Sequence, residues 1–174
     1  MPASVTALLA YLLFVLLVVV APGLALQRVF RLREDPALVL PLGILFGSAA
    51  YGGALVLDRA WIFPALVVLV DLCLLLGSRH GFALGPSLRG AVIPVGALVA
   101  VLALTDYTSN RVGRHGGFIL DKTEAVDTAF HVGVAYELAH GYPPQVPGLA
   151  GVRLVYHYGP DLLRAALVRF AKVS

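Results

Sequence analysis

Apolar residues are gathered into four long runs in the first 106 residues of the chain. The runs cover residues 4–26, 37–57, 61–76 and 90–105, and short polar segments separate them. About 20 apolar residues in a helix are enough to cross roughly 30 Å of hydrocarbon. The pattern therefore predicts an all-α protein, an integral membrane bundle of about four transmembrane helices.

The first apolar run also resembles the core of a secretory signal peptide. A signal peptide has basic residues before an apolar stretch of about 7–15 residues. The chain begins MPASVT, without lysine or arginine, and its apolar run is longer than such a stretch. We therefore interpret residues 4–26 as a retained helix. After it, Asp35 and Pro36 have the residue types of a helix N-cap followed by a first-turn proline, so the second helix is predicted to begin there.

Arginines are distributed unequally between the predicted loops. The loops after the first and third runs hold Arg28, Arg31, Arg33, Arg79 and Arg89. The loop after the second run holds only Arg59, and the N-terminal residues hold no basic side chain. Because cytoplasmic loops are enriched in basic residues, the N-terminus and all residues after 106 are predicted to be extracytoplasmic. The predicted location is the cell membrane, in a multi-pass arrangement.

Composition agrees with the membrane class. Hydrophobic residues make up 59% of the chain and charged residues 13%, whereas a soluble domain carries about 25% charged residues. The net charge of +3 is spread along the sequence without a basic cluster, which argues against a nucleic-acid partner. Cys73 is the only cysteine and lies in an apolar run, so an intrachain disulfide is excluded and a thiolate metal site is not indicated.

Two features stand out inside the predicted membrane helices. Gly43 and Gly47 are four residues apart, a spacing that lets a second helix approach closely. Packing within the chain is the favoured interpretation, since neighbouring helices are available, and dimerisation is the alternative. Asp71 lies near the middle of the third run, where a carboxyl group is either protonated and hydrogen-bonded or part of a proton or cation relay.

Ionisable and aromatic side chains are concentrated between residues 121 and 161. This stretch has five of the ten acidic residues and three of the five histidines. Residues 107–161 are predicted to form an outer loop that contains a helix over about 122–139, followed by a proline-rich coil over 142–153. A last helix is expected from residue 162. About 12 helical residues cannot cross a membrane, so it resembles the start of a further span in a longer protein.

Asp127 and His131 are four residues apart in the predicted outer helix, so their side chains can meet. Three interpretations stay open: Asp127 orients His131 or acts as a general base, the pair shares a ligand such as a divalent cation, or it forms an ordinary helix salt bridge. Glu124 and His157 are the nearest further ligands for a cation, and no zinc-type spacing is present.

Tyr156, His157 and Tyr158 place aromatic rings and a histidine together. Such residues suit stacking against a sugar or a nucleobase, and they also suit the membrane interface. Asp121 and Glu124 precede them in the same outer segment and are further candidates for substrate binding.

Several outer residues share a distinctive spacing: Asp127-Thr-Ala-Phe-His131, Gly141-Tyr-Pro-Pro144, Pro147, Ala150-Gly151, Leu154-x-Tyr156 and Asp161-Leu-Leu. This spacing resembles a pattern found in large multi-spanning bacterial membrane proteins related to the GT-C class of glycosyltransferases. Enzymes of this class place an acidic residue in the first large outer loop and transfer a sugar from a polyprenyl-phosphate donor. The resemblance implies that Asp106 or Asp127 is that acid, with His131 beside it, and that arginines such as Arg153 hold the donor phosphate.

The sequence thus predicts the N-terminal part of a membrane glycosyltransferase that uses a lipid-linked sugar on the outer face of the membrane. Two alternatives remain. One is a non-enzymatic membrane scaffold or transporter subunit, in which Asp71 and the small-residue face matter more than the outer loop. The other is a truncated product without activity of its own.

Overall fold

The computed structural model describes residues 3–32, 35–77, 111–112, 118–119 and 125–172, which are mostly helical. Residues of several predictions lie outside this part of the chain: the fourth apolar run at 90–105, Asp106, Asp121, Glu124, Arg33, Arg79 and Arg89.

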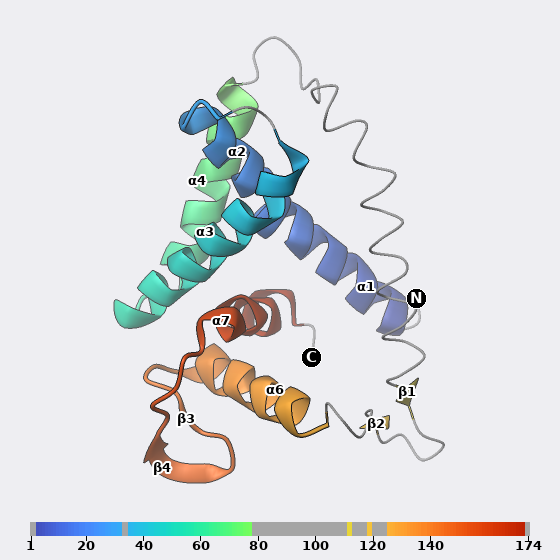
Figure 1. Ribbon diagram of the computed structural model, residues 1–174, viewed down its shortest axis with the longest axis vertical. Coiled ribbons are helices and arrows are strands. Elements are labelled where there is room, and N and C mark those ends of the chain that lie inside the picture. The colour runs from blue at the N-terminus through green and yellow to red at the C-terminus, as the bar shows by residue number, and fades with distance from the viewer. Residues whose placement is uncertain (1–2, 33–34, 78–110, 113–117, 120–124, 173–174) are drawn as a thin grey trace.

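The first helical segment is continuous but changes its hydrogen-bonding pattern in the middle. It consists of α1 (Ala3–Phe14), the π-helical turn η1 (Val15–Val20) and α2 (Ala21–Val29) (Figure 1). The backbone N–H of Ala21 donates to the carbonyl of Leu16, five residues back. Pro22 follows directly, and a proline has no N–H and clashes with the carbonyl four residues before it. A locally wider turn accommodates that clash.

Two further helices pack beside this segment. They are α3 (Pro36–Val56) and α4 (Ile62–Gly77). The predicted N-cap of α3 is confirmed, because the Asp35 carboxylate accepts a hydrogen bond of 2.9 Å from the N–H of Ala37. The buried Gln27 side chain also bonds the backbone N–H and carbonyl of Asp35, at 2.7 and 3.2 Å. The end of α2 is thereby attached to the beginning of α3.

Among the described residues, two helical stretches are long and apolar enough to cross a membrane: Val5–Val29 and Ala37–Val56. The apolar helix Ile62–Gly77 is shorter. In the most apolar part of Val5–Val29, only 22% of the residues are buried inside the protein. In the most apolar part of Ala37–Val56, 39% of the residues are buried. The exposed side chains are large and apolar, among them Leu8, Leu12, Leu45 and Leu76. Water would solvate such a surface poorly, whereas hydrocarbon matches it.

Glycines let the first segment and α3 approach until their backbones touch. A Cβ atom at Gly43 would overlap the carbonyl group of Val19, and one at Gly23 would overlap that of Val39. A Cβ at Gly47 would press on the side chains of Val18 and Leu163. The close face is thus reciprocal, with a glycine from each helix against the backbone of the other.

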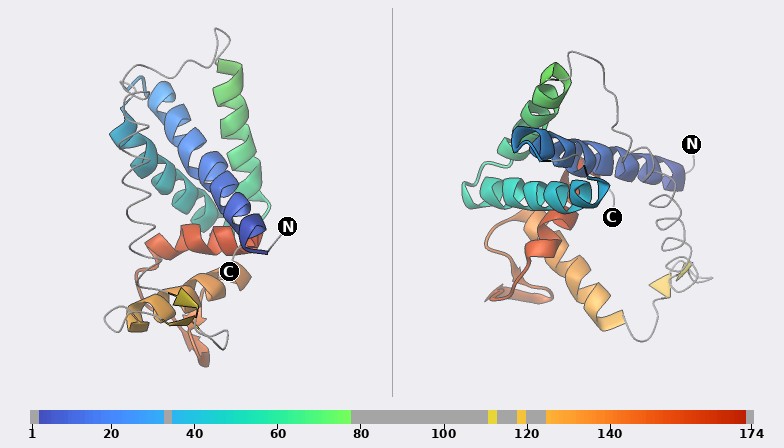
Figure 2. Two further views of the ribbon diagram at one scale, coloured as in Figure 1. Left: turned by 90° about the vertical axis from the view of Figure 1, so that its right-hand side faces the viewer. Right: turned by 45° about the horizontal axis from the view of Figure 1, so that its top comes forward.

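A second layer lies across one end of this three-part bundle. It contains α6 (Ala125–His140), the strands β3 (Gln145–Val146) and β4 (Leu149–Arg153), α7 (Gly159–Ala166) and the π-helical turn η2 (Leu167–Ala171). Figure 2 shows α7 crossing beneath the ends of the other helices, with α6 on its far side. The short strands β1 (Arg111–Val112) and β2 (Phe118–Ile119) pair antiparallel. We call the part from α6 to η2 the outer layer.

The proline-rich segment predicted to be a coil contains a hairpin, so that prediction was wrong in its central part. Strands β3 and β4 pair antiparallel, with Val146 opposite Leu149. Pro147 and Gly148 form the two-residue connection, and Gly148 has a φ of 80°. Proline followed by a glycine with positive φ is the residue order of a type II turn. The Gln145 side chain also accepts a hydrogen bond of 2.9 Å from the N–H of Gly151.

A buried tyrosine joins the bundle to the outer layer. The Tyr51 hydroxyl donates a hydrogen bond of 3.1 Å to the carbonyl oxygen of Leu138. That carbonyl lies in the last turn of α6, where helix carbonyls have no partner within the helix. The Tyr51 ring packs edge-on against Phe63 of α4 and Phe170 of η2 at centroid distances of 5.4 and 6.2 Å. One hydrophobic core therefore runs through both layers.

Replacing Tyr51 by phenylalanine should loosen the outer layer without unfolding the bundle. The substitution keeps the ring but leaves the Leu138 carbonyl without its donor, at a cost of about 1–3 kcal/mol. Hydrogen exchange of the α6 amides should become faster. Tyr11→Phe, at an exposed position of α1, is the matched control and should leave the exchange unchanged. Equal α6 exchange in both variants would show that Tyr51 does not hold the layers together.

Candidate functional site

The outer layer contains a fully buried carboxylate, Asp161, whose side chain has an exposed fraction of 0%. Asp161 is the third residue of α7, after Gly159 and Pro160, and its N–H donates to the carbonyl of Tyr158 at 3.0 Å. A negative charge in the first turn of a helix is favoured by the helix dipole. Burial of a charge is nevertheless expensive unless partners satisfy it. Asp161 has two such partners.

His131 of α6 is the first partner. Its Nδ1 atom lies 2.9 Å from Oδ2 of Asp161, across 30 residues of sequence. An ionised carboxylate only accepts hydrogen bonds, so the proton of this bond belongs to Nδ1. The Nε2 atom of a neutral His131 is then an acceptor. Since 29% of the His131 side chain is exposed, the imidazole is held from one side and accessible from the other.

Arg164 is the second partner. Its guanidinium donates to Oδ1 of Asp161 at 3.1 Å, from one turn further along α7. The two oxygens of Asp161 are therefore bonded to different side chains, the His131 imidazole and the Arg164 guanidinium. The Arg164 side chain is 59% exposed, so solvent reaches much of it. The cluster offers a histidine acceptor and an arginine donor beside each other at the surface of the outer layer.

Aromatic rings continue the surface from His131. The ring of Tyr156 meets Phe130 edge-on at 5.5 Å and lies 6.5 Å from the His131 ring. His157 stacks on Tyr156 with a centroid distance of 4.0 Å and an interplanar angle of 28°. Tyr156 and His157 are both exposed. This arrangement gives a flat aromatic face next to an oriented imidazole, which suits the stacking of a ring-shaped polar ligand.

Two further tyrosines of the outer layer, Tyr142 and Tyr158, contact each other. The Tyr158 hydroxyl donates to the Tyr142 hydroxyl at 3.2 Å. This hydrogen bond, together with partial burial, raises the pKa of Tyr158, while the charge of Arg153 acts in the opposite direction. Tyr158 is therefore a neutral hydroxyl at physiological pH, able to donate or accept hydrogen bonds.

The structure brings together some of the residues that the sequence selected. His131, Tyr156 and His157 form one surface, and Tyr158 and Arg153 lie close enough for the arginine charge to act on the tyrosine. Asp127 lies in the backbone of α6 one turn before His131, and its side chain is outside the described part. Asp106, Asp121 and Glu124 lie outside the described residues altogether.

Asp161 and Arg164 are site residues that the sequence interpretation did not select. In the sequence Asp161 stands out only as part of the Asp161-Leu-Leu run that carries the resemblance. A signal was present, since an aspartate in the first turn of a helix with an arginine three residues later forms an ion pair readily. What the sequence does not give is the contact with His131, which comes from another helix. Within the described residues, no group of three or more histidine, cysteine, aspartate or glutamate side chains is placed to hold a metal ion.

Comparison of the chain with family models, curated proteins and solved structures gave no match. A function for this chain is therefore inferred from the geometry of the outer layer.

Proposed function

We propose that the chain is a multi-pass membrane protein whose outer layer lies on the extracytoplasmic side. Support comes from the ends of the helices. The beginning of α1, the turn between α3 and α4 and the outer layer all lie at one end of the bundle (Figures 1 and 2). Arg28 and Arg31 lie at the end of α2, at the opposite end. In short loops basic residues favour the cytoplasmic side, and the turn between α3 and α4 holds only Arg59, so we infer that the outer layer lies outside.

We further propose that the outer layer transfers a sugar from a lipid-linked donor to a hydroxyl group. The observation that carries this proposal is the 2.9 Å bond between His131 and the buried Asp161, beside exposed aromatic rings. A carboxylate that fixes a histidine through Nδ1 leaves Nε2 to accept a proton, as general base catalysis requires. Aromatic faces such as Tyr156 suit the apolar face of a sugar ring.

In this reaction His131 accepts the proton of the acceptor hydroxyl. The acceptor oxygen forms a bond to the anomeric carbon of the sugar, and the bond from that carbon to the phosphate oxygen breaks. The polyprenyl phosphate leaves with the bonding electron pair, and a guanidinium such as that of Arg164 stabilises its negative charge. Asp127, one turn before His131, is the second candidate for the base, as the resemblance to GT-C enzymes suggests. Asp161 is a positioning residue, since it acts through His131.

Replacing His131 by glutamine should lower sugar transfer about 100-fold to 10,000-fold, the range for losing a general base. Membrane vesicles that contain the full chain would be incubated with radiolabelled polyprenyl-phosphate mannose, glucose or galactose. Transfer of label to acceptors in the vesicles would be measured. His140→Gln is a matched control, because His140 is exposed on the same helix and its Nδ1 bonds the Tyr136 carbonyl at 2.7 Å rather than a carboxylate. Equal transfer by both variants would remove His131 from the reaction.

One observation favours a second function, that of a transporter subunit. Oδ1 of Asp71 is buried in α4 and has no hydrogen-bond partner among the described residues. An unsatisfied carboxyl oxygen inside a membrane helix is a site for a proton or a cation. If this is its role, Asp71→Asn will abolish ion-dependent uptake in cells, whereas His131→Gln will leave uptake unchanged.

A further inference from the structure

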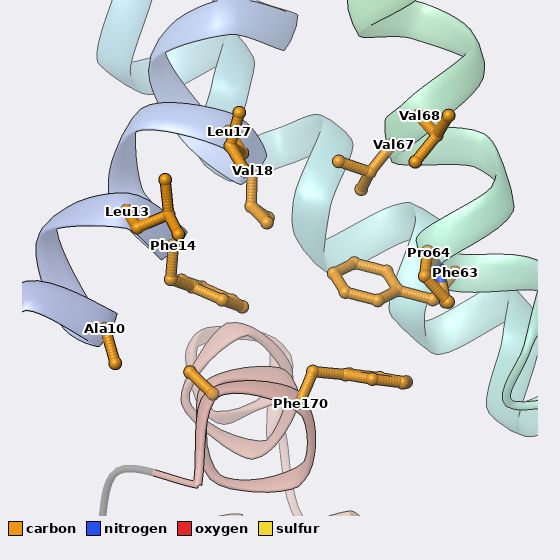
Figure 3. A pocket seen from close by; sticks show the side chains of 11 residues that line it. Ala10, Leu13, Phe14, Leu17, Val18, Phe63, Pro64, Val67, Val68 and Phe170 are labelled. Carbon is orange, nitrogen blue, oxygen red and sulfur yellow. The ribbon is translucent and has the colours of Figure 1, made fainter. Parts of the chain in front are cut away.

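An apolar groove of about 420 Å³ lies between the first helical segment and α4, at the outer end of the bundle. Phe14 and Val18 form one wall, Phe63 and Val67 form the other, and Phe170 of η2 lies across the outer end (Figure 3). All eleven lining side chains are apolar. The groove is separate from the His131–Asp161 pair, none of whose residues contributes to its lining.

The dimensions of the groove limit what can fill it. A spanning helix is about 30 Å long, more than twice the length of the groove's lining along the first segment. The lining of the first segment extends from Ala10 to Val18, about 12 Å along the helix. A single hydrocarbon chain is thin enough to enter such a space. An empty groove would deprive its walls of dispersion contacts that a lipid chain can supply.

Positive charge at the outer end of the groove indicates what kind of lipid headgroup would be favoured there. Phe170 and Ala171 line the groove, and cationic side chains flank them in the chain: Arg169 before and Lys172 after. Arg169 also interacts with the Tyr51 hydroxyl, and Lys172 is exposed. A hydrocarbon chain in the groove would bring its headgroup to these cations. Each lysine or arginine near a membrane surface contributes about 1 kcal/mol to the attraction of anionic lipid.

We propose that the groove holds one acyl chain of an anionic phospholipid, with the phosphate headgroup beside Lys172. This inference rests on the membrane placement proposed above, but not on sugar transfer. The lipid would fill the space between the first segment, α4 and η2, and so fix the outer layer on the bundle. The occupant is a phospholipid of the surrounding bilayer, distinct from a polyprenyl phosphate donor.

Native mass spectrometry of the full chain tests this occupant. The protein would be purified in detergent micelles that contain equal amounts of phosphatidylglycerol, phosphatidylethanolamine and polyprenyl phosphate. We expect one phosphatidylglycerol to be retained per chain. Val68→Trp should lower its occupancy at least about tenfold, because the indole fills the groove. Leu69→Trp is the matched control. Leu69 is next to Val68 on α4 and is 56% exposed, against 55% for Val68, but it does not line the groove.

A second pair of variants tests the headgroup independently of packing. Lys172→Gln should reduce the preference for phosphatidylglycerol over phosphatidylethanolamine about fivefold. Arg31→Gln is its control, because Arg31 is also exposed and has a φ of 52° against 51° for Lys172, but lies at the other end of the bundle. Retention of no lipid, retention of polyprenyl phosphate instead, or equal effects within either pair would overturn the proposal. A chain that enters membranes but keeps no lipid refutes this inference alone, whereas His131→Gln with unchanged transfer refutes the catalytic proposal alone.

Discussion

Replacing Asp161 by asparagine should lower kcat for sugar transfer about 100-fold to 10,000-fold and leave KM for the donor nearly unchanged. The amide has nearly the shape of the carboxylate but no negative charge, and its NH₂ group can turn toward His131. The imidazole then loses the partner that fixes its Nδ1 proton, and Nε2 is no longer held as the acceptor. The measurement is the rate of label transfer in vesicles at several donor concentrations.

The same substitution should cost about 1–3 kcal/mol of folding free energy, because hydrogen bonds to a buried charged group are lost. Asp58→Asn is the matched control. Asp58 is an exposed aspartate in the turn between α3 and α4, with a φ of 51° that asparagine also adopts readily. If Asp161→Asn and Asp58→Asn transfer sugar equally well, Asp161 does not position a catalytic histidine.

Replacing Gly43 by alanine should destabilise the bundle, and more strongly than replacing Gly53 by alanine. The new Cβ atom would overlap the carbonyl group of Val19, and backbone cannot move aside as a flexible side chain can. Overpacking of this kind costs about 1–3 kcal/mol, and the cost is at the upper end when two helices must separate. The measurement is the midpoint of thermal unfolding in detergent, followed by size-exclusion chromatography of the heated protein.

Gly53 in the same helix provides the control, because a Cβ atom there would meet no atom of another described element within 4 Å. Gly53→Ala should leave the midpoint unchanged or raise it slightly, since alanine favours a helix over glycine by about 1 kcal/mol. A midpoint for Gly43→Ala equal to that of Gly53→Ala would show that the first segment and α3 do not pack through this face.

The positions of the long helices were readable from the sequence, because an uninterrupted apolar run leaves few other structures for its backbone. The runs at 37–57 and 61–76 fall on α3 (Pro36–Val56) and α4 (Ile62–Gly77), and Asp35 forms the cap that its residue type indicates. The π-helical turn at Val15–Val20 was not expected, since it depends on how the chain adapts to Pro22 while packing against α3.

The hairpin was missed although its turn was visible. Three prolines between residues 143 and 147 favoured an extended coil. The last of them, Pro147, is followed by Gly148, and this pair is a turn signal in its own right. The lesson is that the local residue order of a turn outweighs the overall proline content of a segment.

The candidate site could be predicted only in part. Concentrated histidines and aromatic rings directed attention to His131, Tyr156 and His157, and the rings of these three residues lie together in the structure. The partner of His131 could not be predicted, because helical periodicity shows only neighbours within one helix. Asp127 is such a neighbour, whereas Asp161 reaches His131 through the packing of α7 against α6.

Labelling of single cysteines tests most directly whether the layer that carries His131 lies outside the cell membrane. In a Cys73→Ala background, Val155→Cys would mark the outer layer, where Val155 is 91% exposed, and Phe30→Cys would mark the opposite end of the bundle. A thiol reagent that cannot cross membranes should label position 155 in intact cells and position 30 only after the cells are opened. Labelling of position 30 in intact cells, with position 155 protected, would place the His131–Asp161 pair in the cytoplasm and contradict sugar transfer on the outer face.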